Sequence, residues 1–232
     1  GGGADQLTGG DSGSTLGYTT SDAGVTINLL DRTASGGHAE GDTFDDKFSN
    51  VAGSAHDDSL TGKDNANLLE GRAGDDTLLG LGGNDDLRGA NGADTLNGGA
   101  GADRYSGGNG ADTFVINEGE ADGDFIADFE ANDRIISNYA DFIKGAGFSG
   151  SAGELRYFHD DGFTIFEGDI DGDGVADESF TVNGEFGFEE TEFGILVADT
   201  ARDFDTNGFA DLMFQTAGGG NFLRLTDIDG LA

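Results

Sequence analysis

Carboxylate side chains recur every ninth residue through the middle of this 232-residue chain. Seven nine-residue units follow one another without a gap from Gly53 to Val115. The sixth position of each unit carries an oxygen donor: Asp58, Asn67, Asp76, Asp85, Asp94, Asp103 and Asp112. Oxygen atoms of this kind are the ligands that hard divalent cations such as Ca²⁺ take. The regular spacing therefore predicts a series of ion sites.

Two other positions of the unit are equally regular. The first position is always glycine, at Gly53, Gly62, Gly71, Gly80, Gly89, Gly98 and Gly107. The eighth is always apolar, at Leu60, Leu69, Leu78, Leu87, Leu96, Tyr105 and Phe114. This is the G-G-x-G-x-D-x-U-x pattern of calcium-binding parallel β-rolls. A flexible glycine-rich linker, the alternative, does not place an apolar residue at every ninth position.

The glycines have a mechanical role in this pattern. Glycine allows positive φ and lets backbone carbonyl groups turn toward an ion. From the third unit onward we expect the glycines of the first and fourth positions to contribute ligands beside the acids: Gly71, Gly74, Gly80, Gly83, Gly89, Gly92, Gly98, Gly101, Gly107 and Gly110. His56 and Asn65 replace the fourth-position glycine in the first two units.

These ligands must be positioned by a coil. The first six residues of a unit are expected to curl, and the last three to form a short strand whose middle side chain points inward. Two units would make one coil, so that two stacked turns together supply the six to eight oxygens, at about 2.3–2.6 Å, that Ca²⁺ takes. We expect Asp76 to pair with Asp94, Asp85 with Asp103, and Asp94 with Asp112. The pairs Asp58/Asp76 and Asn67/Asp85 are expected to be weaker.

The predicted fold is all-β: a parallel β-roll, or nonapeptide-repeat solenoid, capped by a C-terminal β domain. We divide the chain into the end of a first repeat block, an inter-block β segment, the main roll, a capping domain and a final segment: residues 1–17, 18–52, 53–115, 116–198 and 199–232. Because the chain begins inside a repeat, we expect it to be a fragment or a processed product. A cap is needed because the last coil of a roll exposes apolar surface and unpaired strand edges.

Smaller elements are also predicted. Val25, Ile27 and Leu29 alternate with polar residues and should share one face of a strand. Short strands are expected at Phe163–Glu167 and Ser179–Val182, and a short helix over Tyr139–Lys144.

The net charge of the chain limits the classes of partner that it can bind. Eleven Lys and Arg residues stand against 46 Asp and Glu, which gives a net charge of −35. Nucleic acid and anionic membranes would be repelled by such a chain, and self-repulsion makes an ion-free compact state costly. No run of residues is long and apolar enough for a transmembrane segment. The absence of cysteine excludes disulfides and thiolate metal sites.

Two acidic loops follow the repeats. The first has Asp169, Asp171, Asp173 and Asp177 around Gly174. The second has Asp203, Asp205, Asn207 and Asp211 around Gly208. Alternating ligands with a glycine at the sixth position are how the first half of an EF-hand loop wraps calcium. The alternative for each loop is a solvated acidic turn that holds no ion.

The repeats resemble those of RTX exoproteins, and residues 113–198 resemble the C-terminal domain of serralysin-type secreted proteins. The matching words are Ala111–Val115, Asp124–Phe129, Gly153–Tyr157 and Glu167–Asp177. The resemblance implies a roll that folds on Ca²⁺ outside a Gram-negative-type bacterium, with an uncleaved type I secretion signal near the C-terminus. The family often binds a further ion through the aspartate matching Asp128, but Ile136 replaces its usual partner here. Residues 199–232 resemble one FG-GAP-like propeller blade.

No catalytic motif is visible. The H-E-x-x-H signature of the serralysin proteases is absent, and His38, His56 and His159 are isolated. The favoured function is a non-catalytic, calcium-dependent folding and secretion module whose partners are calcium ions and the type I secretion apparatus. The second is a structural or adhesive surface protein, an S-layer or biofilm component, that self-associates through calcium. A third is the tail of a secreted protease or lipase.

Overall fold

The structure, a computed structural model, describes residues 3–10, 13–145, 147–192 and 195–198, and two short strands beyond them. The chain divides into two compact units, Gly1–Ala198 and Asp199–Ala232. In the second unit β22 (Met213–Gln215) pairs antiparallel with β23 (Phe222–Arg224). The predicted ligands of the second acidic loop, Asp203, Asp205, Asn207 and Asp211, lie outside the described residues.

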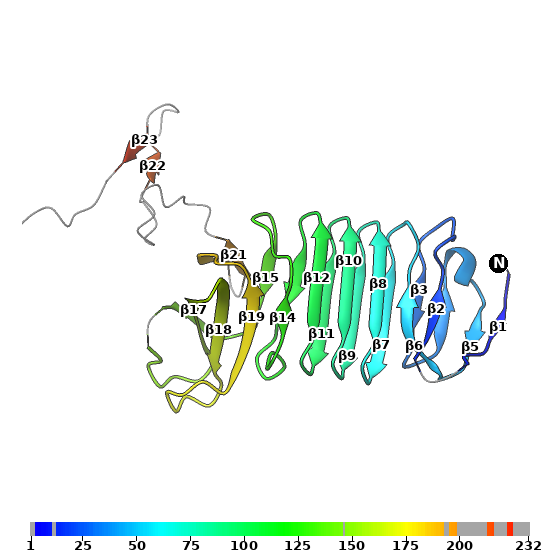
Figure 1. The fold of residues 1–232 in the computed structure, drawn as a ribbon, viewed down its shortest axis with the longest axis horizontal. Helices are drawn as coiled ribbons and strands as arrows, with labels where there is room; N and C mark the ends of the chain where they lie inside the picture. Colours follow the sequence, from blue (N-terminus) through cyan, green and yellow to red (C-terminus); the bar gives the residue numbers. More distant parts are fainter. Residues whose placement is uncertain are drawn as a thin grey trace, which may run out of the picture. The chain divides into compact units, whose positions relative to one another are not determined.

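The nonapeptide units form two parallel sheets that face each other (Figure 1). One sheet holds β6 (Phe48–Ala52), β8 (Leu68–Ala73), β10 (Asp86–Asn91) and β12 (Arg104–Asn109). The other holds β7 (Ser59–Asp64), β9 (Thr77–Gly82), β11 (Thr95–Ala100) and β13 (Thr113–Val115). Leu87 lies in register with Leu69, and Leu96 with Leu78. Unit n therefore stacks on unit n+2, and the predicted parallel β-roll is confirmed.

The eighth-position side chains fill the space between the two sheets. Leu60, Leu69, Leu78, Leu87, Leu96, Tyr105 and Phe114 are each at most 1% exposed. On either side of Leu78, Thr77 is exposed and Leu79 half-buried, as a period of two along the strand requires. Burying one such leucine stabilises the fold by about 1.5–3 kcal/mol.

The strands are longer than predicted. β9 runs through Gly80 and Leu81 to Gly82, so six residues are in the strand and only the fourth to sixth positions form the turn. From Gly62 onward the first-position glycine therefore lies inside a strand, buried and without positive φ. Positive φ occurs instead at the second and fourth positions, for example at Leu81 (83°) and Gly83 (107°). The predicted six-residue curl was wrong because these glycines serve close packing rather than chain reversal.

The N-terminal segments continue the stack. β2 (Ser14–Gly17) pairs with β6, and β3 (Thr26–Asn28) pairs with β7 in parallel and with β4 (Thr33–Ser35) in antiparallel fashion. A separate parallel pair joins β1 (Gln6–Leu7) and β5 (Thr43–Phe44), and a 3₁₀ turn, η1, covers Gly37–Ala39. Val25, Ile27 and Leu29 are all buried, as their alternation predicts.

The C-terminal segments extend both sheets. β14 (Phe125–Ile126) and β15 (Arg134–Ile136) add parallel strands beyond β12 and β13. β17 (Glu154–Asp160), β18 (Phe163–Asp169) and β19 (Glu178–Asn183) follow on one sheet, and β20 (Phe188–Glu192) and β21 (Ile195–Ala198) on the other. The strands predicted around Phe163 and Ser179 are confirmed. The rings of Phe166 and Phe180 stack at 4.4 Å in the aromatic core of this part.

The predicted helix over Tyr139–Lys144 is wrong. Residues Asp141–Lys144 form a strand, β16, that pairs in parallel with β17. The strand places the Phe142 ring at the sheet edge, where it stacks on Tyr157 with 5.8 Å between the ring centroids. This contact favours the strand over the helix. Within the described residues, no helix has the length and apolar character needed to cross a membrane.

Candidate calcium sites

The sixth-position side chains line up in two rows, one at each edge of the roll. Row A consists of Asp58, Asp76, Asp94 and Asp112, and row B of Asn67, Asp85 and Asp103. Within a row each aspartate after the first member accepts a hydrogen bond from the backbone N–H of the residue 18 positions earlier. The Asp76 N–H donates to Asp94 Oδ1 at 2.8 Å, and the Asp85 N–H donates to Asp103 Oδ1 at 2.7 Å.

The rows are positioned by the strands that follow them. Each of these residues ends a turn directly before a strand, so its backbone is held by the ladder of the next coil. The Thr95 N–H donates to the Asp76 carbonyl at 2.8 Å, and the Arg104 N–H donates to the Asp85 carbonyl at 2.8 Å. The parallel register of the strands therefore fixes the register of the acids.

The second carboxylate oxygen distinguishes five of these residues. It is buried and has no hydrogen-bond partner in the described part of the chain at Asp76, Asp85, Asp94, Asp103 and Asp112. A buried polar group left unpaired costs about 1–3 kcal/mol, and a charged one costs more. Five such oxygens in one roll therefore favour a cation or a proton beside them.

The electrostatics of the metal-free protein lead to the same conclusion. Burial raises the pKa of Asp76 and Asp85 to about 7, and the pKa of Asp94 and Asp103 to about 6. The pKa of Asp112 is raised as well, again chiefly by burial. Neighbouring carboxylates add to this effect, as Asp94 does at Asp76. Without a cation, the charged forms of these side chains are therefore disfavoured.

The first-position glycines leave room for a group of oxygen atoms beside each sixth-position side chain, and we call this place the corner of the coil. A Cβ added at Gly80 would lie 2.2 Å from Asp85 Oδ2 and 2.6 Å from the Gly98 carbonyl oxygen. A buried carboxylate oxygen and a backbone carbonyl of the next coil thus lie beside the same point. Carboxylates and carbonyls together are the donor set of Ca²⁺, so the residues present fit the ion.

The fourth-position glycines allow the turns to stack on one another. A Cβ at Gly92 would meet the Gly74 carbonyl oxygen at 1.9 Å, and a Cβ at Gly110 would meet the Gly92 carbonyl oxygen at 1.8 Å. Both glycines also have positive φ, at 132° and 150°. Any side chain at these two positions would separate the coils.

The first member of each row is already satisfied by the protein. Asp58 Oδ1 accepts from the Val25 N–H at 2.7 Å, and Oδ2 accepts from the Ser54 N–H at 2.5 Å. Asn67 Oδ1 accepts from the Lys63 N–H at 2.7 Å, and its Nδ2 donates to the Ser49 carbonyl at 2.8 Å. These two residues lack the free oxygen of the other five, so calcium ligation by them has the least support.

Two members of the rows were missed in the sequence. The Asp103 N–H donates to Asp124 Oδ1 at 2.8 Å, and the Asp112 N–H donates to Asp133 Oδ1 at 2.9 Å. Both bonds span 21 residues because three extra residues precede Asp124. The sequence segments Asp124-Phe125-Ile126 and Asp133-Arg134-Ile135 keep the D-x-apolar order and lie nine residues apart. This pattern could have revealed Asp124 and Asp133 as members of the rows.

The first acidic loop gathers three of its four predicted ligands. Carboxylate oxygens of Asp169, Asp171 and Asp177 all lie within 4.8 Å of one another. Asp173 is not part of this group. Its Oδ1 accepts from the Val175 N–H at 2.8 Å. Asp177 Oδ2 also accepts from the Ile170 N–H at 2.7 Å. The loop is ordered by its own backbone, and an ion in it stays a prediction.

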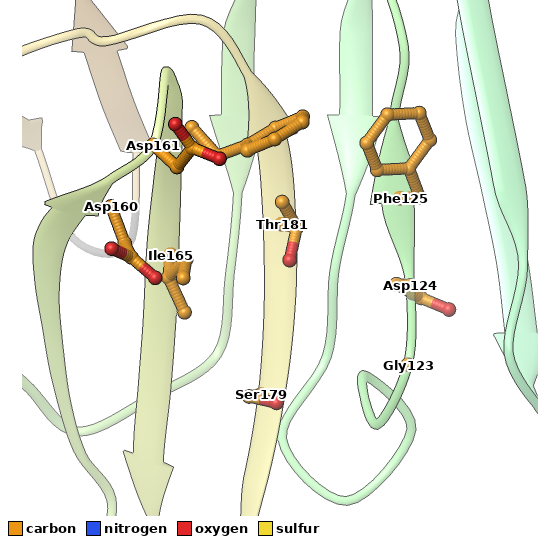
Figure 2. Close-up of a pocket in the computed structure, with 9 residues that line it drawn as sticks. Gly123, Asp124, Phe125, Asp160, Asp161, Ile165, Ser179 and Thr181 are labelled. Atoms are coloured by element: carbon orange, nitrogen blue, oxygen red, sulfur yellow. The ribbon is translucent and has the colours of Figure 1, made fainter.

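An open pocket of about 450 Å³ lies beside β14, β18 and β19 (Figure 2). Its lining comes from β14 and its preceding turn, the end of β17 and the turn after it, β18 and β19: Gly123, Asp124, Phe125, Asp160, Asp161, Phe163, Ile165, Ser179 and Thr181. Figure 2 shows the Asp124 carboxylate turned away from those of Asp160 and Asp161. The three acids do not converge on one point, and Asp124 belongs to row B.

Comparison with known proteins agrees with this geometry. Residues 52–87 and 79–114 match the family model of the RTX calcium-binding nonapeptide repeat. This part of the chain belongs to that repeat family, and the ion that it binds is Ca²⁺.

Comparisons with curated proteins and with solved structures add less information about this chain. No curated protein matches the chain. Among solved structures, the solution structure of the AlgE6R3 subunit of the Azotobacter vinelandii mannuronan C5-epimerase is 31% identical, over 55% of this chain and 71% of that one. Its TM-score of 0.25 is too low to support a shared overall shape, so the β-roll rests on the register of the strands and on the repeats.

Proposed function

We propose that this chain is a non-catalytic, calcium-dependent folding module of an exported protein, and that its C-terminal part directs type I secretion. The observation that carries the first half is the set of five buried aspartate oxygens, arranged in two rows, that have no hydrogen-bond partner among the described residues. The second half is supported by the resemblance of residues 113–198 to the serralysin-type C-terminal domain.

The roll's own residues make folding conditional on the ion. Bound Ca²⁺ supplies the positive charge that the corners lack. The free oxygens of rows A and B would hold it, together with carbonyl groups of the first- and fourth-position glycines. In its absence, buried like charges and a net charge of −35 favour the expanded chain. Each site filled at 100 times its Kd adds about 2.7 kcal/mol to stability, so several coupled sites suffice to drive folding.

The calcium concentration inside or outside the cell then determines whether the chain is unfolded or folded. Calcium sites of extracellular modules have Kd values of about 10⁻⁴–10⁻³ M, which the low calcium inside a cell does not fill. The chain therefore stays unfolded and able to thread through an exporter, and it folds once outside.

The folding half is tested by calcium titration of the full chain, followed by far-ultraviolet circular dichroism. We expect a cooperative gain of β-structure with Ca²⁺ and none with Mg²⁺, which dehydrates reluctantly and demands a smaller octahedral shell. Asp94→Asn should raise the calcium midpoint. Asp64→Asn removes the same charge from an exposed site at the end of β7 and should leave the midpoint unchanged. A spectrum that chelator does not alter would refute this half.

The secretion half is tested separately in a Gram-negative host that carries a type I exporter. A reporter fused to the full chain should reach the medium, and the same fusion ending at residue 115 should not. The triple variant Asp76→Asn, Asp94→Asn and Asp112→Asn should still be exported, because export needs only the unfolded chain. Export of the truncated fusion would show that the signal does not lie in residues 116–198.

A further inference from the structure

One eighth-position residue reaches beyond the apolar core. Tyr105 stands where the five preceding units have leucine, and it is 1% exposed. Its hydroxyl group donates to Asp124 Oδ2 at 2.9 Å and accepts from the Gly98 N–H at 3.2 Å. Asp124 continues row B, since its Oδ1 accepts from the Asp103 N–H as Asp85 and Asp103 accept from the residues 18 positions before them. Its second oxygen, unlike that of Asp85 and Asp103, has a protein partner.

We propose that the Tyr105 hydroxyl takes the place of a calcium ion at Asp124, which makes this member of row B a metal-free position. This inference rests on the proposed function, because it concerns which carboxylates of the rows need the ion. It adds a residue whose role the repeat pattern does not specify.

The position of the hydroxyl supports the substitution. A Cβ added at Gly98 would lie 2.0 Å from Asp103 Oδ2 and 2.5 Å from the Tyr105 hydroxyl oxygen. The phenol oxygen therefore lies in the same corner that holds the free carboxylate oxygen. At Gly80, one coil earlier, the corresponding neighbours are Asp85 Oδ2 and a backbone carbonyl, with no donor among them. The hydroxyl fills the place beside Asp124 that an ion would need.

The chemistry of the phenol suits this role. A tyrosine hydroxyl has an ordinary pKa of about 10, so it stays a hydrogen-bond donor at neutral pH. It satisfies the buried oxygen of Asp124 without bringing a charge. The ring packs edge-on against Phe114 at 6.2 Å, which fixes the hydroxyl over the carboxylate. This side-chain contact adds to the backbone pairing of β14 with β12, so the last coil is joined to the roll at Asp124 by protein groups.

The same arrangement occurs a second time, near the other end of the stack. The Asp5 N–H donates to Asp42 Oδ1 at 2.7 Å, and the Tyr18 hydroxyl donates to Asp42 Oδ2 at 2.9 Å. Asp42 and Tyr18 are both buried. Figure 1 places β5, which follows Asp42, and β14, which follows Asp124, on opposite sides of the repeat strands. The five free oxygens lie between two carboxylates that tyrosines satisfy.

The test counts bound calcium ions on the full chain by native mass spectrometry. Asp103→Asn should lose one ion relative to the unmodified chain, whereas Asp124→Asn should lose none. Tyr105→Phe should bind one ion more, because it frees Asp124 Oδ2, and should keep less β-structure in chelator by circular dichroism. Tyr139→Phe is the matched control: it removes a buried tyrosine–carboxylate bond, to Glu178, in which no member of the rows takes part, and should leave the ion count unchanged.

The outcomes separate this inference from the proposed function. Loss of one ion in Asp124→Asn, while the unmodified chain binds calcium, would overturn the inference alone. An unmodified chain that binds no calcium would overturn both. If Tyr105→Phe fails to fold, the comparison of Asp103→Asn with Asp124→Asn still decides, since asparagine keeps the oxygen that accepts from the Asp103 N–H.

Discussion

The backbone N–H of Asp76 donates to the carboxylate of Asp94 in the next coil of the same sheet, at 2.8 Å. One oxygen of Asp94 is therefore committed to the protein, and only the other is free for an ion. The Asp94 N–H in turn donates to Asp112 Oδ1 at 2.9 Å. Each aspartate of row A thus connects two coils mechanically as well as through any ion that it binds.

Asp94→Ala should therefore weaken calcium binding on both sides of its coil. It removes one free oxygen, and it leaves the buried Asp76 N–H unpaired, at a cost of about 1–3 kcal/mol. Asp112→Ala, nearer the end of the row, should affect mainly the last site. Calorimetric titration of both variants checks this, and loss of the same number of sites from each would contradict the stacked-pair arrangement.

Leu87→Ala should lower the free energy of unfolding of the calcium-loaded roll by roughly 2–5 kcal/mol, as a buried large-to-small change. Leu87 is 0% exposed and lies between the sheets. Leu79→Ala, at a half-buried position of β9 in the facing sheet, is the control and should cost much less. Denaturant unfolding in excess calcium measures both, and equal losses would mean that the inward assignment is wrong.

Acid should stabilise the metal-free roll. The folded-state pKa is about 7 for Asp76 and Asp85, above the ordinary value of 3.8, so the folded chain binds more protons than the unfolded chain between these values. This contribution to stability is fully present below pH 3.8 and is lost as the pH rises through 7. In chelator, we expect more β-structure by circular dichroism at pH 5 than at pH 7.5. With calcium present the trend should reverse, because protons compete for the same oxygens; a flat profile in chelator would count against buried, ion-free carboxylates.

The second position of the repeat stores backbone strain. Arg72, Leu81 and Ala90 have φ of 91°, 83° and 86°, and the next two units have Gly99 and Gly108 there, with φ of 87° and 95°. A non-glycine residue in such a conformation costs of order 1 kcal/mol. Ala90→Gly should therefore stabilise the loaded roll by up to about 1 kcal/mol, while Ala93→Gly in the adjoining turn, where φ is not positive, should destabilise it by about 0.5–1 kcal/mol. Thermal unfolding of the two variants measures these changes in stability. A loss of stability in Ala90→Gly would show that the strain is absent.

Much of this architecture could be predicted from the repeat alone. Three chemically different positions held in phase were enough to predict the stacking of alternate units and the inward leucines. The length of the strands could not be predicted, because a glycine such as Gly80 suggests a turn whether it serves chain reversal or close approach to Asp85. Asp124 and Asp133 were missed because an insertion shifts them out of phase, although their local words persist. The strand at Asp141–Lys144 depends on a distant partner, β17, which a local pattern does not contain.

The alternation of consecutive units between the two sheets has a consequence for how such a chain can change length. Removing a single nine-residue unit would send every later strand to the opposite sheet and bring Asp124 under the wrong row. Removing two units would delete one whole coil and leave every remaining neighbour in place. Viable relatives of this chain should therefore differ in repeat length by multiples of 18 residues, the span between stacked aspartates. The natural unit of growth and loss in this molecule is the pair of repeats.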